Sequence, residues 1–487
     1  MTGRRIHIIG IIAALWAAPT LGLAVDDLTV LHLSDLHVPH AFAQTQEVVA
    51  ALPVGTPIEL TPYGVTAAPP GAILVTGDLN EFGGGEGAWE RYLSLWADLG
   101  IPVYHQLGNH DNTWECARPR LRALGQAPFT AFEMAGVKFI GWDTATPQDP
   151  RPSIATEGLR WLQMEFARTP VTQPVIFYCH HPLDGREFAG EYDRARLLDL
   201  LATRNVVLML VGHGHGVRAW PVGGIDTAMG GSSWGDRRGY GIVSIRDGIL
   251  RVAYRRLTGA DELTPLLEKP LVEEAPRLEA LTVAPPDGTI LTPEAADAWS
   301  LRVRSEDGVI EGRWTLDGEA TGPLTREGEL WVARPVLEAP LEPGAHVIRL
   351  EVTDTTGRSA GRTVRFFLEG GPLGIAWSRQ LDGTVQGAPV LAGDRLYVGA
   401  NDGTLTALEA ASGRTLWRVT TDGEVRGAPA VDPATGRVFM ASADGSARAF
   451  DPEGVELWRA DLGSPTYATP LLVGERLFCP TGAGAIV

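Results

Sequence analysis

Five short polar motifs in the first half of the chain each follow a run of apolar residues. Such runs, short and rich in Val, Ile and Leu, are typical of buried strands. The motifs are SDLH at 34–37, TGDLN at 76–80, LGNHD at 107–111, YCHHP at 178–182 and VGHGH at 211–215. This pattern predicts an α/β core whose rigid sheet positions functional loops.

The five motifs supply the ligand types of a two-metal site. Nine of the 11 histidines fall between His32 and His215, where the apolar runs are. A carboxylate such as Asp78 can bridge two ions, while imidazoles and an amide oxygen fill the other positions without excess negative charge. Two such ions stabilise the attacking and leaving oxygens of an in-line displacement and lower the pKa of a bound water. The expected substrate is therefore a phosphate ester.

In this order and with these glycines, the motifs resemble the calcineurin-like metallophosphoesterase family over about residues 28–257. The resemblance implies a two-sheet sandwich flanked by helices, with two divalent or transition metal ions (Mn, Fe or Zn). For the first ion it implies the ligands Asp35, His37, Asp78 and His215. For the second ion it implies Asp78, Asn109, His180 and His213.

The same resemblance assigns His110 as the proton donor to the leaving oxygen and Asp111 as its orienting partner. His180 and His181 compete for one ligand position, because adjacent residues of a strand point to opposite sides. The family pattern H-x-P places the ligand at His180, with His181 behind it or near the substrate. Glu81 stands where purple acid phosphatases have a tyrosinate ligand, which argues against a purple Fe(III) centre. Asp111, where the nucleotidase branch usually has Glu, argues against that branch.

The leading hypothesis is an exported hydrolase, a phosphatase or phosphodiesterase, in which a metal-bridging hydroxide attacks the phosphorus of a mono- or diester. All seven ligand positions are filled, which favours an active enzyme. The alternative is a binding or scaffold protein that uses its carboxy-terminal repeats and keeps a vestigial metal domain. A net charge of −18 argues against nucleic acid as a partner, because such binding relies on cationic patches.

The amino terminus, residues 1–24, has the features of an export signal. Arg4 and Arg5 precede an apolar stretch that ends at Pro19, and small residues then allow cleavage after Ala24. The short stretch argues against an uncleaved membrane anchor, and no further transmembrane span is expected. The arginine pair leaves a twin-arginine route open. The expected location is periplasmic, extracellular or at the cell surface.

Composition changes twice after the metal domain, which is expected to span residues 25–257. Residues 258–280 are acidic and contain prolines, as in a linker. Residues 281–370 alternate apolar and polar positions between Gly, Pro and Asp turns, which predicts an antiparallel β-sandwich resembling an immunoglobulin or fibronectin type III module. The 3 cysteines allow one pair at most, Cys116 with Cys179, and the preferred interpretation is that all are small buried apolar residues.

Residues 371–487 contain a repeat. Trp377, Trp417 and Trp458 recur at intervals of 40 and 41 residues, each followed by a small-residue and proline step. This period predicts β-propeller blades, and A-L-x-A-x-S/T-G-x-x-L-W resembles the tryptophan-docking repeat of quinoprotein-like (PQQ-like) propellers. The repeat does not imply a bound quinone, and we expect it to offer a surface for a protein partner.

The repeat region holds about two and a half blades, whereas a closed propeller has about four to eight. Three explanations are open: a truncated gene product, a sequence that is part of a longer one, or an array completed by another chain. All expected metal ligands lie at or before His215, so neither downstream module is expected to be needed to build the site.

Overall fold

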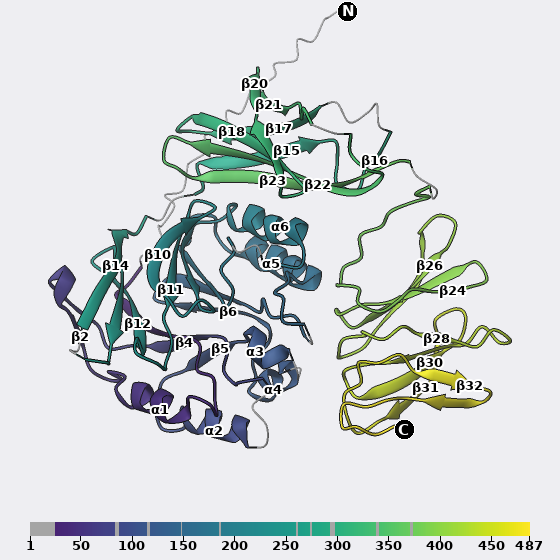
Figure 1. The fold of residues 1–487 in the computed structure, drawn as a ribbon, viewed down its shortest axis with the longest axis horizontal. Coiled ribbons are helices and arrows are strands. Elements are labelled where there is room, and N and C mark those ends of the chain that lie inside the picture. Colours follow the sequence, from purple (N-terminus) through teal and green to yellow (C-terminus); the bar gives the residue numbers. More distant parts are fainter. Residues whose placement is uncertain are drawn as a thin grey trace, which may run out of the picture.

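The computed structural model describes residues 25–82, 87–113, 117–147, 149–184, 187–259, 262–272, 275–292, 298–337, 340–370 and 374–487. Three bodies of β-sheet follow one another along the chain (Figure 1). The expected export signal at 1–24 lies outside the described residues. Within the described ranges, no helix is long and apolar enough to cross a membrane.

The first body contains two six-stranded sheets. The first sheet has the order β14 (Glu262–Pro270), β13 (Ile249–Arg256), β12 (Gly239–Arg246), β1 (Leu28–Leu33), β4 (Ala72–Thr76) and β5 (Val103–Gln106). The second has the order β10 (Val217–Val222), β11 (Ile225–Gly230), β9 (Val206–Val211), β8 (Val175–Cys179), β7 (Val137–Trp142) and β6 (Phe129–Met134). A short hairpin and small helices complete it: β2 (Ile58–Leu60), η1 (Thr61–Tyr63), β3 (Val65–Ala67), α3 (Asn109–Asn112) and α4 (Arg118–Ala123).

The two sheets pack face to face, and helices cover their outer faces. Val30 and Leu74 of the first sheet share one apolar core with Phe139 and Ile176 of the second. Helices α1 (Phe42–Ala50) and α2 (Ala88–Ser94) pack on the outside of the first sheet, and α5 (Thr156–Arg168) and α6 (Glu191–Leu201) on the outside of the second. The central strands are apolar on both faces because both faces are buried. The predicted two-sheet sandwich flanked by helices is confirmed.

Parallel pairing brings the ligand motifs to one edge. Strands β1, β4 and β5 run parallel in the first sheet, and β7, β8 and β9 run parallel in the second. The carboxyl ends of parallel strands meet on the same side of a sheet, where α/β proteins bind their ligands. Loops after β1, β4, β5, β8 and β9 carry the five motifs.

The segment expected to be a linker, 258–280, instead contains strand β14, which pairs with β13 along its whole length. Its acidic and proline residues are tolerated because β14 is the outermost strand of its sheet. Leu263 packs on the outer core, and Leu266 and Leu267 pack on the core between the sheets. The first body therefore continues past residue 257, to Pro270.

The second body is a β-sandwich. One sheet has the order β15 (Leu278–Ala284), β17 (Trp299–Ser305), β21 (Leu330–Ala333) and β20 (Thr325–Glu327). The other has the order β16 (Ile290–Leu291), β23 (Ser359–Leu368), β22 (Gly344–Asp354), β18 (Val309–Leu316) and β19 (Ala320–Pro323). Trp299, Trp314, Leu350 and Phe366 lie in the core between them. The predicted sandwich is confirmed, while its likeness to an immunoglobulin module stays a prediction.

The sandwich packs against helix α6 of the first body. Asp199, buried on α6, accepts hydrogen bonds from Arg349 Nε at 3.2 Å and Thr363 Oγ1 at 2.8 Å. The hydroxyl of Tyr192 donates to Asp287 Oδ2 at 2.7 Å. Because these polar groups pair with one another, the interface buries charge without leaving it uncompensated.

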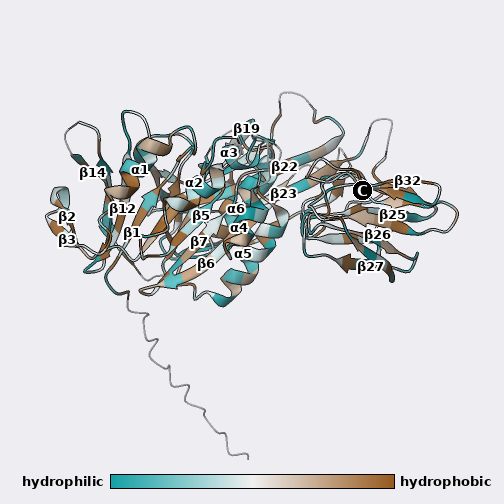
Figure 2. Ribbon diagram, turned by 90° about the horizontal axis from the view of Figure 1, so that it is seen from below, coloured by the Kyte–Doolittle hydropathy of each residue, from teal (hydrophilic) through white to brown (hydrophobic). Residues whose placement is uncertain are grey.

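The third body consists of blades, as the repeat predicted. The first blade has β24 (Val390–Ala392), β25 (Arg395–Gly399), β26 (Thr404–Glu409) and β27 (Thr415–Thr420). The second has β28 (Ala430–Val431), β29 (Val438–Ala441), β30 (Ser446–Phe450) and β31 (Glu456–Asp461), and β32 (Leu471–Val473) and β33 (Arg476–Phe478) follow. Figure 2 shows largely hydrophobic strands around β26 and β32.

The repeated tryptophans dock in the same way. Trp377 Nε1 donates to the carbonyl of Ala410 at 2.9 Å, and Trp417 Nε1 to that of Pro452 at 2.8 Å. The rings lie where a Cβ on Gly413 and on Gly454 would collide with them. Glycine is therefore required at both positions, which explains its place in the repeat.

Candidate metal centre

The loops that carry the expected ligands have strained backbones. Asp35, His37, Asp78, His213 and His215 all have positive φ, between 49° and 66°. Side chains with a Cβ avoid this left-handed region, and each such residue costs about 1–3 kcal/mol. Five of the seven expected ligands therefore sit in conformations that only the surrounding fold maintains. Strain of this kind is typical of functional sites.

Asp78 lies at the centre of the cluster and is buried. Its Oδ2 atom is 3.3 Å from His180 Nε2, 3.8 Å from His37 Nε2 and 3.9 Å from His110 Nε2. Its Oδ1 atom accepts the backbone N–H of His110 at 3.0 Å. Burial alone would raise the pKa of Asp78, but the adjacent imidazoles, His180 above all, hold it well below its usual range. One carboxylate oxygen thus faces three imidazoles, as a bridging ligand requires.

The expected ligands of the first ion come together beside Asp78. His215 Nε2 lies 3.1 Å from Asp35 Oδ1, and ligand atoms of Asp35, His37 and His215 lie within 4.8 Å of one another. His37 Nδ1 donates to Glu81 Oε2 at 2.5 Å, which directs Nε2 towards Asp78. That buried Nε2 makes no hydrogen bond to any residue that the structure describes. The residues present therefore fit a metal ion.

The expected ligands of the second ion also converge. Asn109 Oδ1 lies 3.2 Å from His213 Nδ1. His180 Nδ1 donates to the carbonyl of Thr76 at 2.6 Å, which leaves Nε2 as the ring nitrogen that faces Asp78. Burial lowers the pKa of His180, but the Asp78 charge outweighs it and raises the pKa to about 9. The carbonyl contact fixes the tautomer that a metal ligand needs.

His181 differs from the expectation that it points away from His180. Strand β8 ends at Cys179, so strand alternation no longer applies to the two histidines. Their ring centroids are 4.7 Å apart, and ligand atoms of His180, His181 and His213 lie within 4.8 Å of one another. Thr144 Oγ1 lies 2.8 Å from His181 Nδ1. His181 is therefore part of the site, held by Thr144.

Asp111 does not orient His110, contrary to the expectation. Its carboxylate accepts three backbone N–H groups, from Leu79 at 3.1 Å, Asn80 at 2.8 Å and Gly108 at 2.8 Å. These bonds clamp the Asp78 loop to helix α3. The carboxylate beside His110 is that of Glu81, whose Oε1 lies 3.3 Å from His110 Nδ1. Glu81 therefore contacts both His37 and His110.

Other residues at the site carry no signal in the sequence. Trp234 lies with its ring centroid 5.6 Å from that of His37 and 5.5 Å from that of His215. Phe82 is 46% exposed, and its ring centroid is 4.2 Å from that of His110. Glu187 Oε2 lies 2.8 Å from His213 Nε2. Only Glu81 was predictable in part, because it follows Asp78 in the same motif loop.

Two of the nine histidines between His32 and His215 have a structural role. His32 Nε2 lies 2.8 Å from Thr76 Oγ1, and burial lowers the pKa of His32 to about 4. His105 Nδ1 lies 2.5 Å from the Tyr92 hydroxyl, and burial lowers the pKa of His105 to about 3. Both stay neutral and hydrogen-bonded. Cys179 and Cys479 are free and buried, as preferred, and Cys116 lies outside the described residues.

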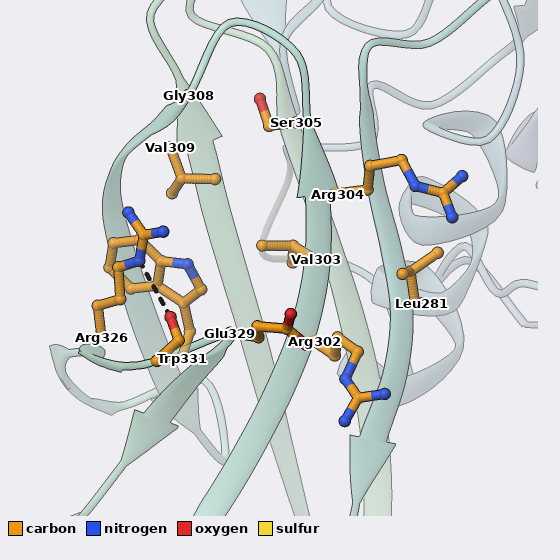
Figure 3. A pocket seen from close by; sticks show the side chains of 11 residues that line it. Leu281, Arg302, Val303, Arg304, Ser305, Gly308, Val309, Arg326, Glu329 and Trp331 are labelled. Atoms are coloured by element: carbon orange, nitrogen blue, oxygen red, sulfur yellow. Dashed lines mark hydrogen bonds between the residues drawn. The ribbon is translucent and has the colours of Figure 1, made fainter.

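A groove of about 410 Å³ lies in the second body, away from the metal ligands. Its floor includes Val303, Val309 and Trp331 (Figure 3). Arg302 and Arg304 extend away from Trp331 in this view, so their charges do not converge. The groove offers no clustered polar chemistry comparable with that around Asp78.

Two family models match the chain. Residues 28–217 match the model described as calcineurin-like phosphoesterase, and residues 349–487 match the one described as outer membrane protein assembly factor BamB. Both resemblances predicted from the motifs are confirmed. The first match ends before strands β11 to β14, which complete the two sheets. The second begins inside β22 of the sandwich, although the blades start only after it.

A curated relative, the outer membrane protein assembly factor BamB of Nitrosomonas eutropha, is 30% identical over 101 residues, 20% of this chain and 24% of the relative. The chain thus spans about a quarter of the curated relative it matches. A single mutant of Vps29 from Entamoeba histolytica is 16% identical, with a TM-score of 0.28, over 49% of this chain and 100% of that one. A predicted phosphoesterase of Streptococcus pneumoniae is 17% identical, with a TM-score of 0.26, over 50% of this chain and 100% of that one.

Proposed function

We propose that the chain is a metal-dependent phosphoric ester hydrolase with two metal ions on either side of Asp78. One observation carries this proposal: six side chains from four strand-end loops gather around the buried carboxylate of Asp78, which a fifth strand-end loop carries. The match of residues 28–217 to the calcineurin-like phosphoesterase model supports it. Manganese, iron and zinc all suit this mixture of imidazole and oxygen ligands.

The ligand loops would hold the ions, and neighbouring residues would act on the bound ester. When bound, the ions supply Lewis-acid stabilisation and an activated water. His110 is suited to protonate the leaving oxygen, since its side chain is 22% exposed and its Nε2 faces the cluster. Glu81, at 3.3 Å from His110 Nδ1, would hold the ring in place. A positioned general acid contributes roughly 100- to 10,000-fold.

Phe82 and Trp234 suggest how the ester would sit. Phe82 packs beside His110, and Trp234 packs beside His37 and His215, so two aromatic faces border the part of the cluster around His37. The alcohol part of the ester would pack on such faces, because the metal ligands themselves offer no apolar surface. The substrate would be a mono- or diester with an apolar or aromatic substituent.

The chain would act outside the cytoplasm, in the bacterial periplasm or cell envelope. The export-type amino terminus and the similarity of its blades to an outer membrane protein assembly factor support this location. The blades would bind a protein partner, and the net charge of −18 disfavours nucleic acid in that role.

A second function, binding or scaffolding through the blades, is favoured by one observation. Trp458, at the next position of the docking repeat, is 40% exposed, and Leu471 and Val473 beyond it are 60% and 55% exposed. These apolar groups would pack against a further blade or against a protein partner. In this alternative the metal domain would be a scaffold without turnover.

Hydrolysis by the full chain separates the two functions. The protein, loaded with Mn²⁺ or Zn²⁺, would be assayed with bis(p-nitrophenyl) phosphate and p-nitrophenyl phosphate, each with and without a chelator. We expect metal-dependent release of p-nitrophenol from at least one ester. A protein that binds two ions per chain yet hydrolyses neither ester would favour the scaffold.

A further inference from the structure

Equivalent loops of two successive blades rest on the first body. The sequence D-G-x-V-x-G occurs at 382–387 and again at 422–427, so Thr384 and Glu424 occupy the same repeat position. The blades lie beside the side of the first body that carries α4 and α5 (Figure 1). Contacts of Thr384 with α5 and of Glu424 with α4 attach them there.

Glu424 forms a buried charge cluster at this interface. Its side chain is 4% exposed, and Oε1 lies 3.0 Å from Arg122 Nη2 and 3.7 Å from Arg118 Nη1. Arg426 of the same loop contributes a third guanidinium, at 3.9 Å. Burial alone would raise the pKa of Glu424, but the arginines lower it, so the carboxylate stays charged. Removing that charge would take away the carboxylate that these three guanidinium groups share, two of which, those of Arg118 and Arg426, are buried.

The cluster continues towards the metal centre through Arg118. Arg118 Nε donates to Asp143 Oδ2 at 2.8 Å, and Asp143 Oδ1 accepts the N–H of Ala145 at 2.8 Å. Both contacts fix the turn that contains Thr144. Thr144 Oγ1 lies 2.8 Å from His181 Nδ1 and accepts the backbone N–H of His181 at 3.2 Å. A continuous set of contacts thus joins the blade to the histidine beside His180.

A second branch reaches helix α3. Asn112 Nδ2 donates to the carbonyl of Ala145 at 3.2 Å, and Asn112 Oδ1 accepts the N–H of Ala117 at 3.0 Å. Asn109, an expected ligand of the second ion, belongs to the same single turn of helix. The turn 143–145 therefore touches both the loop of His180 and His181 and the helix of Asn109.

The matching contact of the first blade is made with helix α5 and not with α4 or Arg118. Thr384 Oγ1 donates to Glu157 Oε2 at 3.0 Å and accepts the N–H of Thr156 at 3.0 Å. Both partners begin helix α5, which packs on the outer face of the second sheet. Thr384 thus contacts the same body as Glu424 but at a helix that carries none of the expected ligands, which makes it a matched control.

We propose that Glu424 is a positioning residue for the second metal ion, acting from the blade through Arg118 and Asp143 on the turn 143–145. The proposal rests on the metal centre of the proposed function. It differs from the sequence-based expectation that no downstream residue is needed to build the site. A partner that displaced this blade from α4 would weaken the second ion and so regulate the site.

Cobalt binding to the metal-free full chain tests the proposal without relying on turnover. Titration with Co²⁺, followed by its visible absorption, reports the affinity and ligand geometry of each ion. We expect Glu424→Gln to weaken binding of the second Co²⁺ by up to about 10-fold, the low end of the effect of losing a direct partner of a ligand, because Glu424 acts through intervening residues. Binding of the first Co²⁺ should be unchanged. Glu424→Asp, which keeps the charge, should recover most of the affinity, and Thr384→Val should bind both ions normally.

Several results would overturn the proposal. They are unchanged Co²⁺ affinity and absorption in Glu424→Gln, an equal loss in Thr384→Val, or a wild-type chain that binds no second Co²⁺. If Glu424→Gln fails to fold by circular dichroism, Asp143→Asn tests the same contacts from the first body and should weaken the second ion alike; unchanged affinity there also overturns the proposal. If the chain hydrolyses no ester but shows these differences in Co²⁺ binding, the proposed function is contradicted and the positioning role of Glu424 is not.

Discussion

The metal loops and the blade turns both use aspartates where the chain reverses, but they place the left-handed backbone differently. In the metal loops the aspartates themselves carry it, with φ of 56° at Asp35 and 50° at Asp78. In the blades glycine carries it, with φ of 80° at Gly403 and 83° at Gly445. The blade aspartate before each glycine bonds to its own loop, as Asp444 Oδ1 does to the N–H of Ser446 at 2.9 Å.

The difference shows what each loop is built for. A blade turn satisfies its own carboxylate and avoids strain, so it serves architecture alone. A metal loop strains a non-glycine residue and turns its carboxylate away from the local backbone towards imidazoles of other loops. Such an arrangement is costly without a ligand, and the buried cores on both faces of the sheets must maintain it.

We expect the largest difference in metal content between substitution of a metal-loop aspartate, Asp78, and of a blade-turn aspartate, Asp444. Asp78→Ala is expected to remove both ions and all activity, because Asp78 is the proposed bridging ligand of both. Asp444→Ala should lower the melting temperature and leave metal content normal, since its carboxylate bonds within the blade. Elemental analysis of both purified variants measures this. Two tightly bound ions in Asp78→Ala would show that it does not bridge them.

The next effect concerns two neighbours in the LGNHD loop. His110→Ala should lower kcat by roughly 100- to 10,000-fold with both ions retained, because we propose His110 as a general acid and not as a ligand. Asp111→Asn should chiefly lower stability, since its carboxylate accepts two backbone N–H groups of the Asp78 loop and that of Gly108. Steady-state kinetics and thermal melts distinguish them. A stable Asp111→Asn with greatly reduced kcat would restore the role that the sequence suggested.

A smaller difference is expected between the histidines that follow β8. His180→Ala should lose the second ion, because its Nε2 faces Asp78. His181→Ala should keep two ions, since its Nδ1 is engaged by Thr144. Metal analysis after dialysis measures both. One ion in His181→Ala and two in His180→Ala would move the ligand by one residue.

The smallest effect measures the strain itself, in the metal-free protein. At His215, with φ of 50°, glycine should be more stable than alanine by about 1 kcal/mol, because only alanine has a Cβ to strain. At His110, inside helix α3, the order should reverse, with glycine about 0.5–1 kcal/mol less stable than alanine. Urea unfolding of the four variants gives both differences. If alanine is more stable than glycine at His215 as well as at His110, the ligand loop stores no strain.

The sequence predicted the metal loops well because each ligand is local to a strand end. Asp35, Asp78 and His180 each follow an apolar strand within two residues. Parallel pairing of the strands then brings these residues to the same edge of the sheets. The partners of His110 were not predictable in this way. Glu81, and not Asp111, lies beside His110, because contacts between the loops after β4 and β5 decide which carboxylate reaches it.

Strand β14 and the contact of Glu424 with α4 were not predicted from the sequence, for a related reason. Strand β14 was mistaken for linker because its acidic and proline-bearing composition suits an edge strand equally well. Glu424 contacts Arg122 of α4, about 300 positions away in the sequence, and no local sequence pattern indicates such a contact. Local motifs therefore predict which residues gather at the candidate metal centre, while the groups that hold those residues in place depend on how the loops and bodies pack.

The central claim is that two ions flank Asp78, and anomalous scattering locates them directly. Crystals of the full chain soaked in Mn²⁺ or Zn²⁺, with data collected at the metal's absorption edge, would show where the ions bind. We predict two peaks, one among Asp35, His37 and His215 and the other among Asn109, His180 and His213, with the Asp78 carboxylate contacting both. A single peak, or two peaks of which only one contacts Asp78, would contradict the account.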